Sequence, residues 1–211
     1  MLEPKNFDCL QDNTRTLLFE LKDTAPFLRN YTFVGGSALA LYLCHRKSED
    51  LDFFTYEDSF SKSEILDYCR RFENFVILND SDNQLDLLIS GIKATFFNAR
   101  WKFLQPLDSG PLNIATLDAL AAMKINTLFL RAKYRDYYDL YSLVTRVYDL
   151  KGLYDCAKGI VPGLTFKLLC IALTYIDDIE DDSIAHLQPE FKLTKEEIRS
   201  YFEQQVRNLT F

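Results

Sequence analysis

The first residues of the chain show the spacing of an amphipathic helix. The inward positions from residue 7 to 28 are Leu10, Thr14, Leu17, Leu18, Leu21 and Leu28. The pattern then changes to a short β-prone run over residues 31–34, which ends at a Gly-Gly pair. A second apolar stretch follows from residue 38 to about 44. The predicted order is therefore helix, strand, helix.

Residues 50–98 contain short β-prone runs separated by polar turns. The expected strands and turns are strands over 50–55, 75–78, 84–90 and 92–98, a turn over 79–83 and another at Gly91. Ser61-x-x-Glu64 is a capping-box pattern that predicts the start of a helix through Cys69. This part of the chain is therefore predicted to be built on a mixed or antiparallel sheet.

The pattern changes again near the turn-forming residues 108–111. A short β-like piece is expected over 112–115, and Thr116 is a plausible helix N-cap. The helices expected after it cover 117–131, 135–149, 152–159, 163–176 and 195–208, the last with the capping box Thr194-x-x-Glu197. We therefore predict an α+β protein with an N-terminal α/β domain over 1–110 and a helical domain over 111–211.

Composition agrees with a folded, water-soluble chain. The 211 residues are 48% hydrophobic, and 31 acidic against 24 basic side chains give a net charge of −7. A nonspecific nucleic-acid coat or a polybasic membrane binder needs the opposite charge, so both classes are disfavoured. The start of the chain lacks the basic and apolar regions of a secretory signal, and no apolar run reaches the ~18 residues of a spanning helix. We expect a cytoplasmic protein without membrane contact.

The five cysteines are widely spread and never form a C-x-x-C pair. This spacing argues against a disulfide framework and against a structural zinc site, so reduced and mostly buried thiols are expected. The histidines, His45 and His186, lie far apart and give little support to a histidine-based metal centre.

The first candidate site combines Gly35-Gly36-Ser37 with Asp50-x-Asp52. Glycines between a strand and a helix let the backbone approach a ligand, and the helix start offers N–H groups to a phosphate. Two aspartates at i and i+2 in a strand share one face, and a divalent cation offsets their repulsion. Taken alone, the Gly-Gly-Ser motif also fits an ordinary strand-to-helix turn. The Asp-x-Asp motif alone also fits an edge strand whose aspartates are solvated.

The second candidate site lies on two predicted helices. Lys124 falls on the apolar stripe of the first helix, with Arg131 near the same stripe, and Asp136 and Asp139 share the inner face of the second. A structural salt-bridge network and one wall of a cleft for an anionic substrate are both consistent with this pattern. The two interpretations are compatible, because such networks also fix functional side chains.

Taken together, the motifs resemble the nucleotidyltransferases of the DNA polymerase β-like superfamily, in which Gly36-Ser37 precedes Asp50-x-Asp52 by twelve residues. More specifically, residues 31–145 resemble the AbiEii/AbiGii nucleotidyltransferase-like toxins of type IV toxin–antitoxin systems. The motifs that carry this resemblance are Gly35-Gly36-Ser37-Ala38-Leu39-Ala40-Leu41, Arg46-x-Ser48-x-Asp50-Leu51-Asp52-Phe53-Phe54, Ala122-Met123-Lys124-Ile125-Asn126 and Arg131-x-Lys133-x-Arg135-Asp136-x-x-Asp139-Leu140.

The resemblance implies a role for each matching residue. Asp50 and Asp52 would bind Mg²⁺, with Asp86 as the third metal carboxylate from a later strand. Nucleotide binding would fall to Gly36, Ser37, Lys124, Arg131 and Asp136. Asp139, or else Asp86, would orient or deprotonate the acceptor hydroxyl. Arg131 stands where the family often has lysine, which changes the geometry of the group.

The implied activity is Mg²⁺-dependent transfer of a nucleoside monophosphate from an NTP to a hydroxyl of RNA, such as tRNA, or of a protein. A cognate antitoxin would act without forming a stable complex. Two alternatives stay open: a non-catalytic nucleotide- or partner-binding protein on the same scaffold, and a housekeeping nucleotidyltransferase. The candidates for a basic rim that holds RNA are Arg46-Lys47, Arg70-Arg71, Arg100-x-Lys102 and residues 131–135. Residues 150–211 carry no motif that we can interpret.

Overall fold

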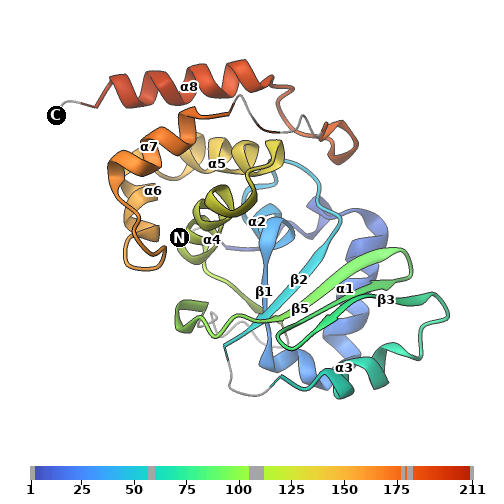
Figure 1. Ribbon diagram of the computed structural model, residues 1–211. Helices are drawn as coiled ribbons and strands as arrows, with labels where there is room; N and C mark the ends of the chain where they lie inside the picture. Colours follow the sequence, from blue (N-terminus) through green and yellow to red (C-terminus); the bar gives the residue numbers. More distant parts are fainter. Residues whose placement is uncertain (1–2, 57–59, 105–111, 177–178, 180–182, 210–211) are drawn as a thin grey trace. The chain divides into compact units, whose positions relative to one another are not determined.

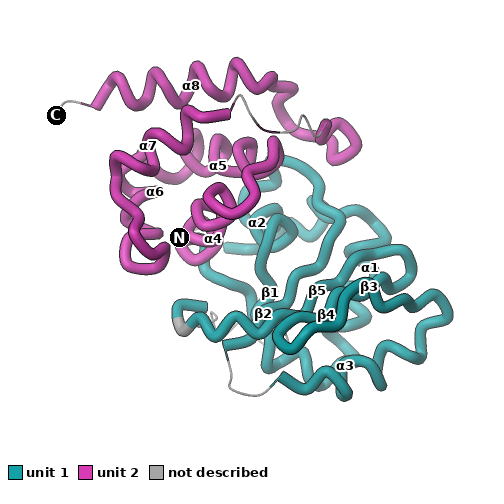
Figure 2. Tube along the Cα trace, in the orientation of Figure 1, with its two compact units in different colours: residues 1–117 teal, residues 118–211 magenta. Residues whose placement is uncertain are grey.

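The computed structural model describes residues 3–56, 60–104, 112–176, 179 and 183–209. The chain divides into two compact units, Met1–Leu117 and Asp118–Phe211, which Figures 1 and 2 show. The first unit contains a mixed sheet and the second is helical, so the predicted α+β architecture is confirmed. The predicted domain boundary at 110/111 lies outside the described residues.

The sheet of unit 1 has six strands in the order β3-β4-β5-β2-β1-β6. The strands are β1 Thr32–Val34, β2 Leu51–Thr55, β3 Phe75–Ser81, β4 Gln84–Ile89, β5 Ile92–Asn98 and β6 Asn113–Ile114. The β1–β6 and β2–β5 pairs are parallel and the other pairs are antiparallel. Strand β3 continues to Ser81, so most of the predicted turn over 79–83 is strand instead.

One face of this sheet is an aromatic layer. Phe33, Phe53 and Phe96 lie directly across from one another on β1, β2 and β5, and all three are fully buried. Their ring centroids are 5.4 Å (Phe33–Phe53) and 5.3 Å (Phe53–Phe96) apart. Because side chains alternate along a strand, this packing directs Asp52 to the opposite face.

The helical segments of unit 1 are η1 Phe7–Cys9, α1 Asp12–Thr24, η2 Pro26–Asn30, α2 Gly35–Leu43, α3 Lys62–Cys69 and η3 Lys102–Leu104. The single helix predicted over 7–28 is wrong, because three separate pieces replace it. Backbone bonds to Ser48 interrupt it: Ser48 N donates to Cys9 O at 3.0 Å, and Gln11 N donates to Ser48 O at 2.9 Å. Helix α3 begins where expected, but Ser61 makes no side-chain cap bond, so that capping box is absent.

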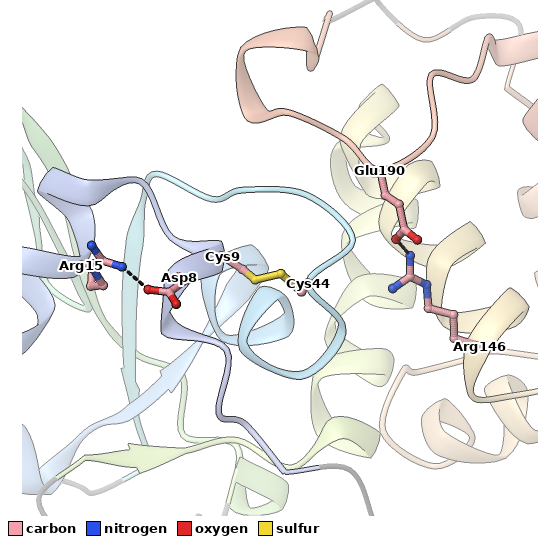
Figure 3. Close-up of a disulfide and its surroundings, with 6 residues drawn as sticks. All are labelled: Asp8, Cys9, Arg15, Cys44, Arg146 and Glu190. Carbon is pink, nitrogen blue, oxygen red and sulfur yellow. Dashed lines mark hydrogen bonds and ion pairs between the residues drawn. A yellow bond between two sulfur atoms is a disulfide. The ribbon is translucent and has the colours of Figure 1, made fainter.

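Cys9 and Cys44 form a disulfide, which corrects the expectation that every thiol is reduced (Figure 3). The bond joins η1 to the residue that ends α2, across a sequence separation of 35 residues and a Cα–Cα distance of 5.4 Å. The pairing has no local sequence signal, because only the packing of η1 against α2 brings the two thiols together. Cys69, Cys156 and Cys170 are free. Beside the disulfide, Arg15 pairs with Asp8.

The described part of unit 2 is helical. Its helical segments are α4 Leu117–Arg131, α5 Tyr134–Arg146, α6 Leu150–Ala157, α7 Phe166–Thr174, η4 Ala185–Leu187 and α8 Lys195–Arg207. The capping box at the start of α8 is confirmed, since Thr194 and Glu197 each accept the other's backbone N–H. Across the described ranges, no helix is both long and apolar enough to cross a membrane.

Candidate active site

Asp52 on β2 is in close contact with Gly35, the first residue of α2. Gly35 opens α2 with a φ of +76°, a conformation that favours glycine. A Cβ added at Gly35 would overlap with Oδ2 of Asp52 and would lie 3.1 Å from its Cγ. The missing side chain therefore provides the space in which the carboxylate lies. Both glycines belong to the first turn of α2, so the helix begins earlier than the sequence predicted.

Arg46 lies over the second glycine of the same turn. A Cβ added at Gly36 would be 2.7 Å from Nη2 of Arg46, so the guanidinium packs on this glycine. Arg46 is only 4% exposed, and its Nη1 donates to the carbonyl of Lys47 at 2.9 Å. The prediction of Arg46 as part of a solvated basic rim is therefore wrong. Its charge lies instead inside unit 1, next to the start of α2.

Ser37 is buried, with 1% of its surface exposed. Its hydroxyl donates to Oγ of Ser48 at 2.9 Å and also contacts the backbone carbonyl of Asp50. The Gly-Gly-Ser turn and the Asp-x-Asp segment, which the sequence identified separately, are therefore joined through Ser48 and the main chain of Asp50.

Asp50 precedes β2 and is half-buried. It lies in the wall of a polar pocket of about 490 Å³ that is formed within unit 1. The lining includes Gln11, Asn13, Glu49 and Lys93. The pocket gives space beside Asp50 for a polar ligand, but its lining does not include Asp52 or the Gly-Gly-Ser turn.

Asp86 lies in the same row of the sheet as Asp52, but not beside it. The register pairs Asp52 of β2 with Thr95 of β5, and Thr95 with Asp86 of β4. The Thr95 hydroxyl donates to Oδ1 of Asp86 at 2.8 Å, and Nε2 of Gln84 contacts both carboxylate oxygens at 3.0 and 2.9 Å. Thr95 thus separates the two aspartates, and the Asp86 carboxylate has hydrogen-bond donors from the chain itself.

The donor chemistry of Asp50 and Asp52 fits a hard divalent cation. Mg²⁺ is commonly held by one or two carboxylates together with water and substrate phosphates. Among the described residues, no group of three or more His, Cys, Asp or Glu side chains is close enough to form a complete cage. A cation at this position would therefore depend on this pair and on oxygens of its substrate.

Unit 2 contains the buried polar cluster that the sequence predicted. Nζ of Lys124 on α4 lies 3.0 Å from Oδ1 of Asp136 and 2.6 Å from Oδ2 of Asp139, both on α5. The two aspartate side chains are fully buried and that of Lys124 is 10% exposed. Asp136 also accepts the backbone N–H of Lys133 at 3.3 Å. The cluster therefore joins α4 to α5 and also caps the start of α5.

Arg131 does not lie in this cluster. It is exposed at the last residue of α4, so the expectation that it faces inward with Lys124 is wrong. Other members of the predicted basic rim have acidic partners. Arg70 pairs with Asp67 at 2.9 Å, and Arg71 pairs with Glu20 at 3.2 Å.

The sequence alone assigns no role to Ser48 or Thr95, and it predicts Arg46 in a basic rim and not inside unit 1. For Arg46 and Ser48, however, the sequence contains a signal of their inward direction. Arg46 and Ser48 precede Asp50 and Asp52 at intervals of two, so a period-two pattern extends back into the loop before β2. Thr95 gave no such signal, because its contact with Asp86 depends on how β4 and β5 pair.

The fold and this site are those of a nucleotidyltransferase-like protein. The family model for the nucleotidyl transferase AbiEii toxin of type IV toxin–antitoxin systems matches residues 16–104. An uncharacterized protein of Aquifex aeolicus is 31% identical over 186 residues, which are 84% of this chain and 87% of that protein. The chain belongs to the AbiEii nucleotidyltransferase toxin family.

Solved structures share the fold at lower identity. MenT4, a nucleotidyltransferase toxin from Mycobacterium tuberculosis, superposes with a TM-score of 0.59 at 20% identity, over 92% of this chain and 81% of that chain. JHP933 from Helicobacter pylori gives a TM-score of 0.54 at 20% identity, over 94% of each chain. These likenesses extend over both units of the chain.

Proposed function

We propose that this protein is an NTP- and Mg²⁺-dependent nucleotidyltransferase that acts in the cytoplasm as the toxin of a type IV-like system. It transfers a nucleoside monophosphate from an NTP to a hydroxyl of RNA, with tRNA as the first candidate, or of a protein. The observation that carries this proposal is the packing of the Asp52 carboxylate against Gly35, at the start of a helix.

Each part of this site has a role in the proposal. Asp50 and Asp52 hold the divalent cation, which when bound neutralises negative charge on the phosphoryl group and the leaving oxygens. The first turn of α2 receives phosphate oxygens through backbone N–H groups, and Val34 at its N-cap makes no side-chain cap bond. The buried guanidinium of Arg46 adds positive charge next to this turn.

We also propose roles for residues of unit 2, but these roles are supported less directly than those of Asp50 and Asp52. Lys124, Arg131 and Asp136 were assigned to the nucleotide, and Asp139 to the acceptor. The ion pairs of Lys124 equally support a role in holding α4 to α5. Measurements of stability and of transfer on the same Lys124 variant separate these roles.

The proposed partners are an NTP, a hydroxyl-bearing macromolecule and an antitoxin that does not bind the toxin stably. The antitoxin is therefore expected to suppress growth arrest without co-purifying with this chain. Co-purification as a stable stoichiometric complex would contradict the type IV assignment and leave the enzymatic proposal untouched.

The central experiment is a transfer assay with purified protein, Mg²⁺ and each of the four labelled NTPs. One arm contains total RNA and the other contains an RNase-treated protein extract. We expect label in one acceptor class, and none after chelation of the metal. Asp52→Asn should abolish transfer without loss of folding.

Asp86→Asn is the matched carboxylate variant, since Asp86 lies on the same sheet but is held by Gln84 and Thr95. It should keep Mg²⁺ binding within about threefold of wild type. Equal loss of Mg²⁺ binding in Asp52→Asn and Asp86→Asn would instead support Asp86 as a metal ligand, the role that the family resemblance implies. Transfer that persists in Asp52→Asn would refute the proposed site.

A further inference from the structure

The face of the sheet that carries Asp52 has an aromatic cluster of its own. Phe54 and Phe97 are paired in the β2–β5 register, with ring centroids 5.0 Å apart. Trp101 follows β5, and its ring centroid lies 6.0 Å from that of Phe54 and 6.4 Å from that of Phe97. Phe103 stacks on Trp101, with ring centroids 5.4 Å apart and an interplanar angle of 20°. We call these four residues the Trp101 cluster.

The rings of the Trp101 cluster are only partly covered. All four side chains are half-buried, whereas Phe53 and Phe96, which precede Phe54 and Phe97 in the same strands, are fully buried on the other face. Aromatic rings stabilise a protein most when they are fully buried, so rings that keep accessible surface beside a candidate site indicate a surface that binds a ligand.

The cluster begins next to the candidate metal site. Phe54 comes two residues after Asp52 in β2, and Phe97 comes two residues after Thr95 in β5. Residues i and i+2 of a strand share one face and lie about 7 Å apart. The Trp101 cluster is therefore a continuation of the face that carries the Asp52 carboxylate.

The pairing of β1 with β2 places the cluster on one side of Asp52 and the start of α2 on the other. Val34, the residue before α2, pairs with Asp52, whereas Thr32 pairs with Phe54. In phosphoryl transfer the attacking and leaving oxygens lie on opposite sides of the phosphorus. With the phosphates of the NTP at the first turn of α2, the acceptor hydroxyl approaches from the side of the Trp101 cluster.

Positive charge lies in the same segment. Arg100 is exposed, and within the part of the chain that the structure describes it makes no hydrogen bond or ion pair. In the sequence Arg100-Trp101-Lys102-Phe103, basic and aromatic residues alternate. Such surfaces bind single-stranded nucleic acids, because bases stack on the rings and cations contact the phosphates. The bases of a duplex are already stacked on one another, so a duplex suits this surface less well.

We propose that the Trp101 cluster is a stacking platform for an unpaired base of an RNA acceptor, and that Arg100 contacts a neighbouring phosphate of that RNA. This inference rests on the proposed function and narrows its acceptor to RNA with a single-stranded segment. The base of the NTP and a protein acceptor are the two competing occupants, and the experiments distinguish both.

A first experiment needs no enzymatic turnover. Trp101 is the only tryptophan in the sequence, so its fluorescence reports on the cluster directly. Wild type is titrated with a single-stranded RNA of about ten nucleotides, a duplex of the same length, an abasic strand of the same length, and each NTP with Mg²⁺. We expect strong quenching by the single strand only. Absence of quenching by the single strand, or equal quenching by an NTP, would overturn the inference.

A second experiment measures the affinity for the same labelled single strand by fluorescence anisotropy. Trp101→Leu should bind at least about fivefold more weakly, whereas Trp101→Phe, which keeps a flat ring, should stay within about threefold of wild type. Phe191→Ala is the matched control, because Phe191 is an aromatic residue of unit 2 with 49% of its surface exposed. It should bind as wild type does. Wild-type affinity in a folded Trp101→Leu protein would overturn the inference.

The contact of Arg100 has its own measurement. Arg100→Gln should reduce the slope of log affinity against log salt concentration by about 0.7, the value for one phosphate contact to a single strand. Arg70→Gln is the control, because Arg70 is exposed in unit 1 but pairs with Asp67. Its slope should equal that of wild type. An unchanged slope in Arg100→Gln would refute the phosphate contact.

Transfer kinetics separate this inference from the proposed function. Trp101→Leu should raise KM for the RNA at least about fivefold and leave KM for the NTP within about twofold of wild type. Transfer to protein only, without quenching by RNA, would overturn the inference and leave a nucleotidyltransferase with a protein acceptor. Absence of transfer to either acceptor in wild type would overturn the proposed function, and the quenching experiment would still decide whether the cluster binds RNA.

Discussion

Nζ of Lys124 lies 2.6 Å from Oδ2 of Asp139, and that aspartate side chain has no exposed surface. A second buried carboxylate, that of Asp136, lies 3.0 Å from the same ammonium group. One cation therefore links two acids of α5 to α4. Removal of one partner from a buried ion pair leaves a charge without its main compensation, which costs far more than loss of a surface pair.

We therefore predict that Lys124→Met destabilises the protein by about 3–5 kcal/mol. The measurement is urea-induced unfolding followed by circular dichroism. Lys158→Met is the control, since Lys158 pairs with Asp155 at 2.7 Å with both side chains exposed. That variant should unfold close to wild type. A Lys124→Met protein of wild-type stability that fails to transfer nucleotide would show instead that the lysine serves catalysis directly.

The Gly35 position gives a second prediction. Gly35→Ala should lose nucleotide transfer, because the added Cβ occupies the space of the Asp52 carboxylate. It should also lose about 1–2 kcal/mol of stability from the left-handed backbone conformation. Gly163→Ala is a matched control with a φ of +74° and no atom within 4 Å of its Cβ position. It carries the same backbone strain, so it should lose similar stability and keep full transfer activity. Equal activity of the two variants would contradict the Asp52 assignment.

Regular elements with strong periodicity could be predicted from the sequence. Helix α4 spans Leu117–Arg131 as expected, because apolar residues recur at helical spacing on both sides of Lys124. The alternation around Asp52 also held, with Leu51 and Phe53 fully buried on the other face of β2. The ion pairs of Lys124 followed from the same logic, since a charged residue on an apolar stripe needs a buried partner.

Features that depend on contacts between distant segments were missed. The loop from Cys44 to Asp50 turns Arg46 and Ser48 inward because η1 and α1 bind its backbone. The period-two spacing of Arg46 and Ser48 indicates their common direction, but it does not reveal these long-range backbone bonds. The location of Asp86 relative to Asp52 likewise depends on strand order, which places β5 between β4 and β2.

The Cys9–Cys44 disulfide gives a third prediction. Protein purified and denatured without reductant should show three reactive thiols, and five after reduction, because five cysteines include one disulfide. In a chain-entropy model, closing a loop of this size contributes about 3–4 kcal/mol to stability. Cys9→Ala should therefore lower the unfolding free energy by that order, and reductant should affect wild type but not the variant. Five reactive thiols in unreduced protein would restore the sequence-based expectation of reduced cysteines.

Alkaline pH should destabilise the protein through two thiols, the buried Cys69 and the half-buried Cys156. Burial raises the pKa of Cys69 from 9.0 to about 12, and burial together with nearby Asp118 raises the pKa of Cys156 to about 11. Above pH 9 the unfolded chain loses these protons while the folded chain keeps them. The unfolded state then binds fewer protons, so the unfolding free energy falls as pH rises from about 9 toward 12 and is unaffected by these groups below pH 9. Each thiol contributes a slope of at most about 1.4 kcal/mol per pH unit.

The measurement is urea-induced unfolding at pH 8 and pH 10.5. The decrease in unfolding free energy between these two pH values should be smaller for Cys69→Ala than for wild type. The same decrease in both proteins would exclude Cys69 as a source of the alkaline sensitivity.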